Sequence, residues 1–161
     1  MKSPRALAAD GLQVGQAFTV VRCFTREDVQ QFARLSRDYN PVHCDAAYAE
    51  LRRFEAPIAH GLLTASLLTE IGGQIGWLAT TMSFEFKRPV YPGEQLTCHW
   101  LISAIDPRGH ARAEVQIVNA EGVSVLEATT CGVLPGPAER ERLKQMLAEG
   151  DPSNGAAQAA G

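Results

Sequence analysis

Residues 61–73 read GLLTASLLTEIGG, and this stretch decides the fold class. Apolar side chains surround a helix of this sequence on nearly every side, and the polar interruptions are Thr64, Ser66, Thr69 and Glu70. A helix that is apolar all round is buried, because a surface helix keeps one polar face. We therefore predict a central buried helix over residues 61–73.

Stretches in which apolar and polar side chains alternate follow this segment. They cover residues 81–90 (TMSFEFKRPV), 94–105 (EQLTCHWLISAI), 111–119 (ARAEVQIVN) and 123–134 (VSVLEATTCGVL). The dipeptide PG and the tetrapeptides DPRG and NAEG separate them, and these are turn signals. Period-two stretches between such turns predict an antiparallel meander. A buried helix followed by an antiparallel sheet predicts an α+β protein with the single hot-dog fold, in which the sheet wraps around the central helix.

The chain before residue 61 predicts a strand and two further helices. Residues 18–23 (FTVVRC) have the β-branched content of a strand, and Thr25 can cap a helix from about residue 26 to 35. Asp28 sits at the third helical position, so the start reads as a capping box. A short helix over residues 46–53 is expected next. These elements should pack against the core through one face.

The turn between these two helices contains the candidate catalytic residues. Residues 36–43 read SRDYNPVH, and Pro41 ends the helix because it lacks a donor and moves Asn40 out of the helical region. Asn40 can hold the bend through bonds to local backbone. Across this bend Asp38 and His43 can both point at one water molecule. An Asp and a His that share one water molecule suit general acid–base chemistry, because one group can take a proton from the water and the other can supply one.

Gly61 is the candidate donor to a developing oxyanion. It begins the predicted buried helix, where unpaired N–H groups and the helix dipole favour negative charge. It also lacks a side chain that would prevent close approach of a substrate. The preceding residue, His60, is expected to orient the loop through hydrogen bonds rather than to act on the substrate.

The same residues carry a family resemblance. Residues 36–43 resemble the hydratase motif of the MaoC-like (R)-specific enoyl-CoA hydratases, and a second block of that family is matched downstream. The matching positions of the second block are Phe54, Pro57, Ile58, His60 and Gly61. The resemblance extends from Gly11 to Leu134. It implies that Asp38 and His43 are catalytic, that the Gly61 backbone binds the substrate oxygen, and that Asn40, Pro41 and His60 support the site.

This resemblance also implies a reaction. It is the reversible hydration of a trans-2-enoyl-CoA to the (3R)-hydroxyacyl-CoA by a homodimer, with no cofactor beyond the CoA of the substrate. Three alternatives stay open: a 3-hydroxyacyl-ACP dehydratase, a hot-dog acyl-CoA thioesterase and a non-catalytic acyl-CoA-binding module. One departure is Arg37, which stands where many family members have glycine.

Charge and cysteine content argue against a nucleic-acid-binding protein, a disulfide-stabilised protein and a zinc protein. The chain has 15 Lys and Arg against 18 Asp and Glu, without a long basic block, so a nucleic-acid partner is not expected. The 4 cysteines show neither CxxC nor CxxH spacing, which argues against a disulfide framework or a zinc site. The carboxylates and histidines around the turn also lack the spacing of a helix-borne ligand pair, and we predict no metal. The doublets Arg52-Arg53 and Lys87-Arg88 could meet CoA phosphates, although such doublets usually lie on a solvated face.

Length and terminal composition predict one domain. We expect the hot-dog domain to cover residues 1–136 and residues 137–161 to form a short helix and a mobile tail of eleven residues. The start of the chain has no apolar run long enough for a signal peptide, and no segment reads as a membrane span. We therefore expect a cytoplasmic protein without a membrane partner.

Overall fold

The structure, a computed structural model, describes residues 1–151 and 153. It contains a five-stranded antiparallel sheet with the order β1-β3-β4-β5-β2. The strands are β1 (Ala17–Cys23), β2 (Leu78–Phe86), β3 (Gln95–Ile105), β4 (His110–Asn119) and β5 (Ser124–Val133). The helices are α1 (Pro4–Asp10), α2 (Arg26–Ser36), the 3-10 turn η1 (Pro41–His43), α3 (Ala46–Leu51), α4 (Gly61–Ala65), α5 (Leu67–Ile75) and α6 (Pro137–Ala148).

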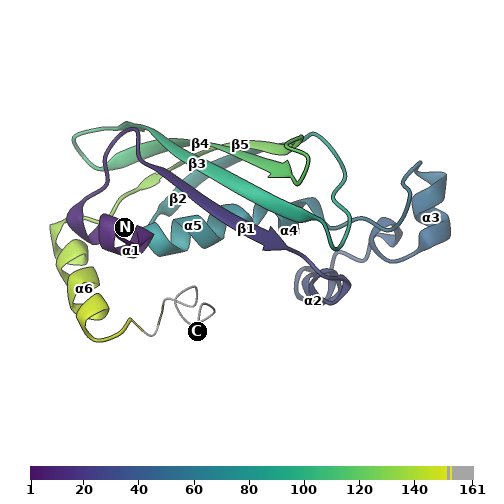
Figure 1. Cartoon of the computed structure of the whole chain (residues 1–161), viewed down its shortest axis with the longest axis horizontal. Helices are drawn as coiled ribbons and strands as arrows, with labels where there is room; N and C mark the ends of the chain where they lie inside the picture. Colours follow the sequence, from purple (N-terminus) through teal and green to yellow (C-terminus); the bar gives the residue numbers. More distant parts are fainter. Residues whose placement is uncertain (152, 154–161) are drawn as a thin grey trace.

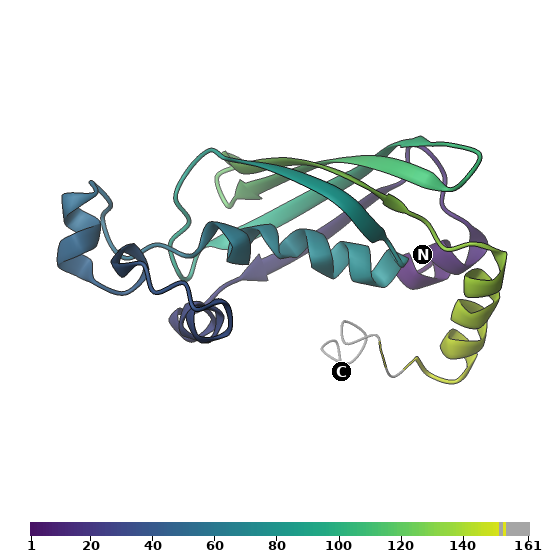
Figure 2. The same cartoon turned by 180° about the vertical axis from the view of Figure 1, so that it is seen from behind.

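The central helical segment lies along one face of the sheet. Figure 1 shows α4 and α5 end to end beneath the strands, and Figure 2 shows the same two layers from behind. The core between the layers includes Leu67, Leu68 and Ile71 from α5 and Trp100 from β3, each at most 2% exposed. An antiparallel sheet curved over a buried helix is the hot-dog fold, so the predicted fold class is confirmed.

The alternation of buried and exposed side chains explains why the strands form a sheet with one face on the core. Along β4 the buried and exposed positions alternate through the first eight residues, as expected for a sheet with one face on the core. Gly109 and Gly122 have φ of +83° and +77° in the turns that flank β4. Glycine adopts this region at little cost, which lets both hairpins close tightly.

The predicted single helix over residues 61–73 is divided in the structure. The break falls at Ser66, which separates α4 from α5. The Ser66 hydroxyl donates to the Leu63 carbonyl and the Thr69 hydroxyl donates to the Ser66 carbonyl at 2.6 Å. Side chains that bond to helix carbonyls in this way compete with the regular ladder and bend it. The helix also continues to Ile75, and Gly76 ends it with φ +68°.

The predicted start of α2 is confirmed. Thr25 Oγ1 accepts from the Asp28 N–H at 3.1 Å, and Asp28 Oδ2 accepts from the Thr25 N–H at 2.7 Å. Phe24 and Val29 are both 4% exposed, so they anchor the entry to the helix in the core. The capping box therefore fixes where α2 begins and, one helix length later, where the candidate turn lies.

Two segments at the ends of the chain pack together, and the first of them was not predicted. Ser3 caps α1 through the Ala6 N–H, and α1 contacts both α5 and α6. Figure 2 shows α1 and α6 at the same end of the molecule, opposite α3. Asp151, the first residue of the expected mobile tail, is instead 4% exposed, with its carboxylate 3.7 Å from Arg5 Nε. The rest of that tail, apart from Ser153, lies outside the described residues, and a domain boundary after residue 136 stays a prediction.

The strand predicted over residues 81–90 begins earlier and ends earlier than expected. β2 runs from Leu78 to Phe86, and the following residues leave the sheet ladder. The N–H groups of Lys87 and Arg88 still donate to the Val125 carbonyl, at 2.9 and 3.3 Å. Further on, the Val90 carbonyl accepts from the Ala59 N–H at 2.8 Å. The segment after β2 thus runs beside the segment that leads into α4.

None of the helices within residues 1–151 is both long and apolar enough to cross a membrane. The four cysteines, Cys23, Cys44, Cys98 and Cys131, are free thiols in the structure.

Candidate active site

The turn after α2 is built from its own side chains. Ser36 Oγ donates to the Phe32 carbonyl at 2.7 Å and accepts from the Asp38 N–H at 3.2 Å. Between them Arg37 adopts the left-handed conformation, with φ 60° and ψ 21°. Asn40 Oδ1 accepts from the Val42 N–H at 3.2 Å and so caps η1. The chain therefore reverses over a few residues, as the sequence predicted.

This reversal places the Asp38 carboxylate close to the His43 ring. The distance between Asp38 Oδ2 and His43 Nε2 is 3.7 Å. Asp38 Oδ1 accepts from the Asn40 N–H at 3.2 Å, which leaves Oδ2 as the oxygen that faces the histidine. The His43 side chain is 10% exposed and that of Asp38 is 49% exposed, so the pair lies at the boundary between core and solvent.

The hydrogen bond on the far side of His43 defines its tautomer. His43 Nδ1 lies 2.8 Å from the Ile58 carbonyl oxygen, which can only accept. Nδ1 therefore carries the proton, and Nε2 presents its lone pair towards Asp38 when the ring is neutral. A separation of 3.7 Å between two acceptors is too long for a direct hydrogen bond. A water molecule that donates one hydrogen to each acceptor would fit this arrangement.

His60 lies directly beneath this pair and is 1% exposed. Its Nε2 donates to the Asp38 carbonyl oxygen at 3.0 Å, so the ring holds the turn through a hydrogen bond of the expected kind. The His60 and His43 rings stack with centroids 3.7 Å apart. Burial lowers the pKa of His60, which keeps this ring neutral beside His43 at neutral pH.

Gly61 follows His60 and begins α4. Within the described part of the chain, no acceptor is bonded to the Gly61 N–H, as expected for the first residue of a helix. A Cβ atom added at Gly61 would lie 2.7 Å from Cε1 of Phe86. The phenyl ring thus occupies the space that a side chain at residue 61 would need, and the sequence alone gave no sign of this contact.

A cavity of about 520 Å³ connects these residues. Asp38, His43 and Gly61 line it together with apolar side chains and two cations. The apolar set includes Phe54, Ile58, Leu62, Phe86, Val90 and Val125, and the cations are Lys87 and Arg88. Cavities of 300 to 1,000 Å³ with mostly apolar walls and a few polar groups are typical of small-molecule sites. The arrangement can therefore hold an apolar group beside a water-activating pair.

Two features of the site were outside the sequence prediction. Phe86 and Val125 come from β2 and β5, and they meet Gly61 only because the sheet curves over α4. No local motif marks either residue. Asp38, His43 and His60 also offer ligand atoms within 4.8 Å of one another. A hydrogen bond from one ring nitrogen to a carbonyl leaves the other nitrogen of each histidine with a lone pair. The predicted absence of a metal therefore stays a prediction.

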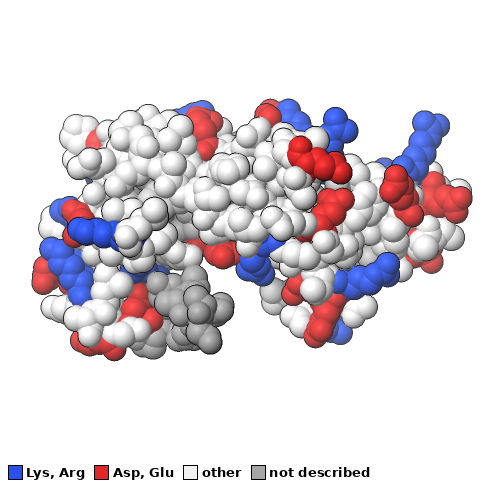
Figure 3. Space-filling model, in the orientation of Figure 1, with Lys and Arg blue, Asp and Glu red and all other residues white. Residues whose placement is uncertain are grey.

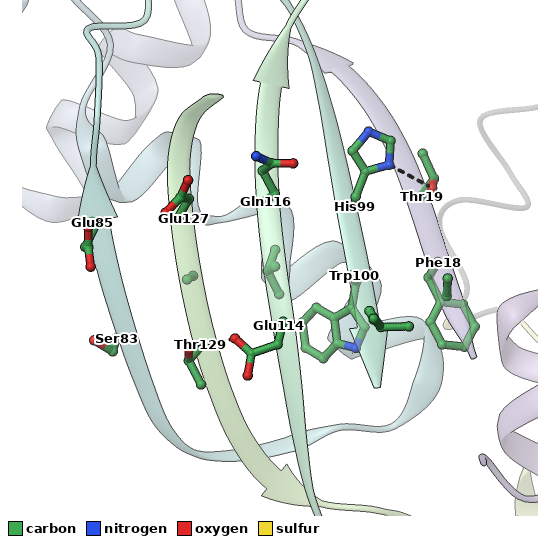
Figure 4. Close-up of a pocket in the computed structure, with 14 residues that line it drawn as sticks. Phe18, Thr19, Ser83, Glu85, His99, Trp100, Glu114, Gln116, Glu127 and Thr129 are labelled. Carbon is green, nitrogen blue, oxygen red and sulfur yellow. Dashed lines mark hydrogen bonds between the residues drawn. The ribbon is translucent and has the colours of Figure 1, made fainter. Parts of the chain in front are cut away.

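A second cavity, of about 530 Å³, lies on the opposite face of the sheet. Figure 4 shows its polar side chains, among them Glu114, Gln116, Glu127 and Thr129, standing on β4 and β5. His99 Nδ1 lies 3.4 Å from Thr19 Oγ1 at one side of this hollow. None of the predicted site residues lines it, so this cavity is separate from the candidate active site.

The sequence matches known proteins that share this fold. Residues 12–121 match the MaoC like domain. The (R)-specific enoyl-CoA hydratase of Aeromonas caviae is 38% identical over 103 residues, which cover 62% of this chain and 77% of that protein. The mitochondrial 3-hydroxyacyl-[acyl-carrier-protein] dehydratase of Arabidopsis thaliana is 33% identical over 87 residues, which are 53% of this chain and 52% of that protein.

A solved structure of a hydratase also matches this fold. The (R)-hydratase from A. caviae involved in PHA biosynthesis superposes with a TM-score of 0.72 at 33% identity, over 78% of this chain and 98% of that one. The 3-hydroxyacyl-thioester dehydratase Y of Mycobacterium tuberculosis is 36% identical, but the match spans only 35% of its length. Since the domain match extends over well over half of the sequence, the chain belongs to the MaoC-like domain family.

Proposed function

We propose that this protein catalyses the reversible, (R)-specific hydration of a trans-2-enoyl-CoA to the (3R)-hydroxyacyl-CoA. The observation that carries the proposal is the 3.7 Å separation of Asp38 Oδ2 and His43 Nε2 in a mostly apolar cavity that Gly61 also lines. The relatives reported above are named hydratases and dehydratases, which supports a hydro-lyase.

The geometry supports a direct chemical sequence. A water molecule held by Asp38 Oδ2 and His43 Nε2 loses a proton to the pair as its oxygen bonds to C3 of the enoyl group. The electrons of the carbon–carbon double bond move towards the thioester, whose oxygen becomes negative. The Gly61 N–H donates to that oxygen. A proton from the pair then reaches C2, so that the elements of one water molecule have been added.

The position of the pair supports addition to a single face. Asp38 and His43 belong to one short turn and lie on the same side of the cavity. The hydroxyl and the proton therefore come from the same side of the double bond. The (R) configuration rests on the relatives, since A. caviae and Rhodospirillum rubrum proteins carry the name (R)-specific enoyl-CoA hydratase.

A second candidate is dehydration of a 3-hydroxyacyl group on an acyl carrier protein. The match to the mitochondrial dehydratase of A. thaliana favours it, and the chemistry is the same reaction reversed. A thioesterase would instead direct water at the carbonyl carbon, whereas the Asp38 and His43 pair suits attack at C3. CoA release from a saturated acyl-CoA would identify a thioesterase, and binding without turnover would identify an acyl-CoA-binding module.

The test is the loss of enoyl thioester absorbance with crotonyl-CoA and octenoyl-CoA, followed by chiral analysis of the product. We expect an (R)-3-hydroxyacyl-CoA from the wild-type protein and no product above background from Asp38→Asn or His43→Ala. Turnover that survives both substitutions, or an (S) product, would refute the proposed mechanism. Turnover only with a carrier-protein thioester would favour the dehydratase.

We further propose a homodimer that works in the cytoplasm without a metal or a separate cofactor. The dimer is supported by β2, an edge strand whose Met82 and Phe86 are 37% and 55% exposed on its inner face. Free thiols at all four cysteines are consistent with a reducing compartment. The chemistry above uses only protein groups, water and the thioester.

A further inference from the structure

The cations near the candidate site differ in their partners. Figure 3 shows acidic and basic side chains close together at the end of the molecule that carries α3. The contacts of each cation there determine whether a carboxylate already neutralises it. Arg52 and Arg53 follow α3 and are exposed, and neither lines the active-site cavity. Lys87 and Arg88 both line it. Of the two basic doublets in the sequence, only Lys87-Arg88 lies at the cavity.

Lys87 is neutralised by two carboxylates. Its ammonium group donates to Glu85 and lies 3.5 Å from Glu127 Oε2. The hydrogen bond to Glu85 is the largest cause of a raised Lys87 pKa, so the group stays charged but its charge is balanced. Both glutamates lie on the outer face of the sheet, where they line the second cavity. Lys87 is therefore poorly placed to receive an additional anion.

Arg88 has no such partner. It is exposed, and its guanidinium forms no ion pair with any residue within 1–151 or with Ser153. Its backbone is nevertheless fixed, because its N–H donates to the Val125 carbonyl at 3.3 Å. The next residue, Pro89, restricts Arg88 to extended conformations. An unpaired cation on a segment with a fixed backbone is available to bind an anion.

The same segment is tied to the catalytic residues. The Val90 carbonyl accepts from the Ala59 N–H at 2.8 Å, and Ala59 precedes Gly61 by two positions. Arg88 therefore lies beside the entry to α4, on the wall of the cavity that contains Asp38. The interior of this cavity is apolar and suits the acyl group. The exposed guanidinium marks the side from which the rest of a thioester would leave.

We infer that Arg88 binds a phosphate of the pantetheine arm that carries the acyl thioester, an assignment that rests on the proposed function. Phosphate is the anion that CoA and an acyl carrier protein have in common at the end of pantetheine. The planar guanidinium offers paired N–H donors that match phosphate oxygens, a geometry that an ammonium group does not provide. Arg88 is thus a substrate-binding residue rather than a catalytic one.

A series of thioesters with one acyl group tests this assignment. Crotonyl-CoA, crotonyl-4′-phosphopantetheine and crotonyl-pantetheine differ in their phosphates but present the same reacting atoms. We expect Arg88→Gln to raise KM for crotonyl-CoA by roughly 5-fold to 20-fold, with kcat nearly unchanged, since a charge-assisted bond to phosphate is lost. For crotonyl-pantetheine, which has no phosphate, KM should be the same in the variant and the wild type.

Arg52→Gln is the matched control. It removes an exposed arginine that does not line the active-site cavity, so KM for all three thioesters should stay within about 2-fold of wild type. Salt gives an independent measurement, because added salt screens an exposed charge pair. KM for crotonyl-CoA should rise with ionic strength in the wild type and in Arg52→Gln, and much less in Arg88→Gln.

The substrate series also identifies the source of the phosphate. An effect with both phosphopantetheine and CoA supports the phosphate that CoA shares with a carrier protein. An effect with CoA alone would place the bound phosphate in the nucleotide of CoA and overturn the assignment to the pantetheine phosphate. An equal KM increase for pantetheine, or no increase for any phosphate-bearing thioester, would overturn the role of Arg88. Absence of turnover in the wild type with all three thioesters and with a carrier-protein thioester would instead refute the proposed reaction.

Discussion

At the scale of single residues, the two stacked histidines have different tasks because their nitrogens have different partners. His43 Nδ1 faces the Ile58 carbonyl at 2.8 Å, which leaves Nε2 for Asp38 and the cavity. His60 Nε2 faces the Asp38 carbonyl at 3.0 Å, and the ring is buried. One histidine therefore presents an unprotonated nitrogen to the cavity, and the other holds the backbone of Asp38.

Asp38 and His43, the proposed catalytic pair, should act as one unit. Asp38→Asn and His43→Ala should each lower kcat by roughly 10²-fold to 10⁴-fold, the range for loss of a general acid or base. The double variant should lose little more than the worse single variant, because the two groups hold one water molecule. Initial rates with crotonyl-CoA check this, with melting temperature as a control for folding. Fully additive losses would mean that the residues act in separate steps.

Burial of His60 predicts a dependence of stability on pH. Its pKa is lowered in the folded protein, so between that value and about 6.5 the unfolded chain binds more protons. The free energy of unfolding therefore falls as the pH decreases below about 7. Melting temperatures between pH 7 and pH 5 measure this loss, which should be smaller in His60→Gln, because glutamine can donate to Asp38 without titrating. An identical loss in both proteins would assign the effect to other groups.

The contact between Gly61 and Phe86 predicts a coupled pair of substitutions. Gly61→Ala should destabilise the protein by about 1 kcal/mol and reduce kcat/KM, because the added methyl group would displace the Phe86 ring into the cavity. Phe86→Ala in the same chain should restore the melting temperature, since the ring is then absent. Thermal unfolding of the two single variants and the double variant gives the coupling free energy. Strictly additive changes would show that the ring and the methyl group do not collide.

At the scale of elements, the site depends on where two helices end and begin. The capping box at Thr25 sets the start of α2, and the left-handed Arg37 ends it immediately before Asp38. The Val90 carbonyl bonds to the Ala59 N–H and so positions the entry to α4. Neither helix carries Asp38 or His43, the proposed catalytic side chains, within its regular turns. The elements act as fixed supports for the two short segments between them.

Arg37 at the end of α2 is a site where a substitution should stabilise the fold. Its φ of 60° is unfavourable for a residue with a Cβ atom, and glycine adopts it freely. Arg37→Gly should raise the free energy of unfolding by about 1 kcal/mol, which corresponds to roughly 2 to 4 °C in melting temperature for a chain of this size. Calorimetry measures the shift, and kcat should be nearly unchanged, because Arg37 does not line the active-site cavity. A lower melting temperature would show that the Arg37 side chain makes a stabilising contact.

At the scale of the whole molecule, the sheet has two open edges, at β1 and β2. Among the described residues, β2 pairs only with β5, and it carries exposed apolar side chains beside the cavity. An edge of this kind invites pairing with another chain. A second copy at β2 would cover Met82 and Phe86 and would also enclose one side of the active-site cavity.

Light scattering tests this assembly. We expect a mass twice that of the 17.4 kDa chain at micromolar concentration. Met82→Lys on β2 should shift the protein towards the monomer, because burying a charge in an apolar interface is costly. Thr19→Lys places the same charge on β1, at the opposite edge, and should leave the dimer intact. A monomeric wild-type protein, or equal effects of the two substitutions, would refute pairing through β2.

The sequence by itself determined the features that depend on local spacing. The buried segment from Gly61, the strands on either side of PG, DPRG and NAEG, and the capping box at Thr25 all follow from periodicity or from bonds within a few residues. The turn that contains Asp38 and His43 is local too, since Asn40 and Pro41 form it. These interactions need no distant partner, so they can be read from the order of residues.

Only the tertiary structure decided which distant residues meet at the site. Phe86 lies against Gly61, and the Ile58 carbonyl selects the His43 tautomer, through contacts that the packing of sheet on helix creates. The same packing brings Glu127 of β5 to the local pair of Lys87 and Glu85 and leaves Arg88 unpaired within the described residues, although the two cations are adjacent in the chain. Contacts of this kind depend on strand register and curvature, and no local pattern encodes which side chains those will bring together.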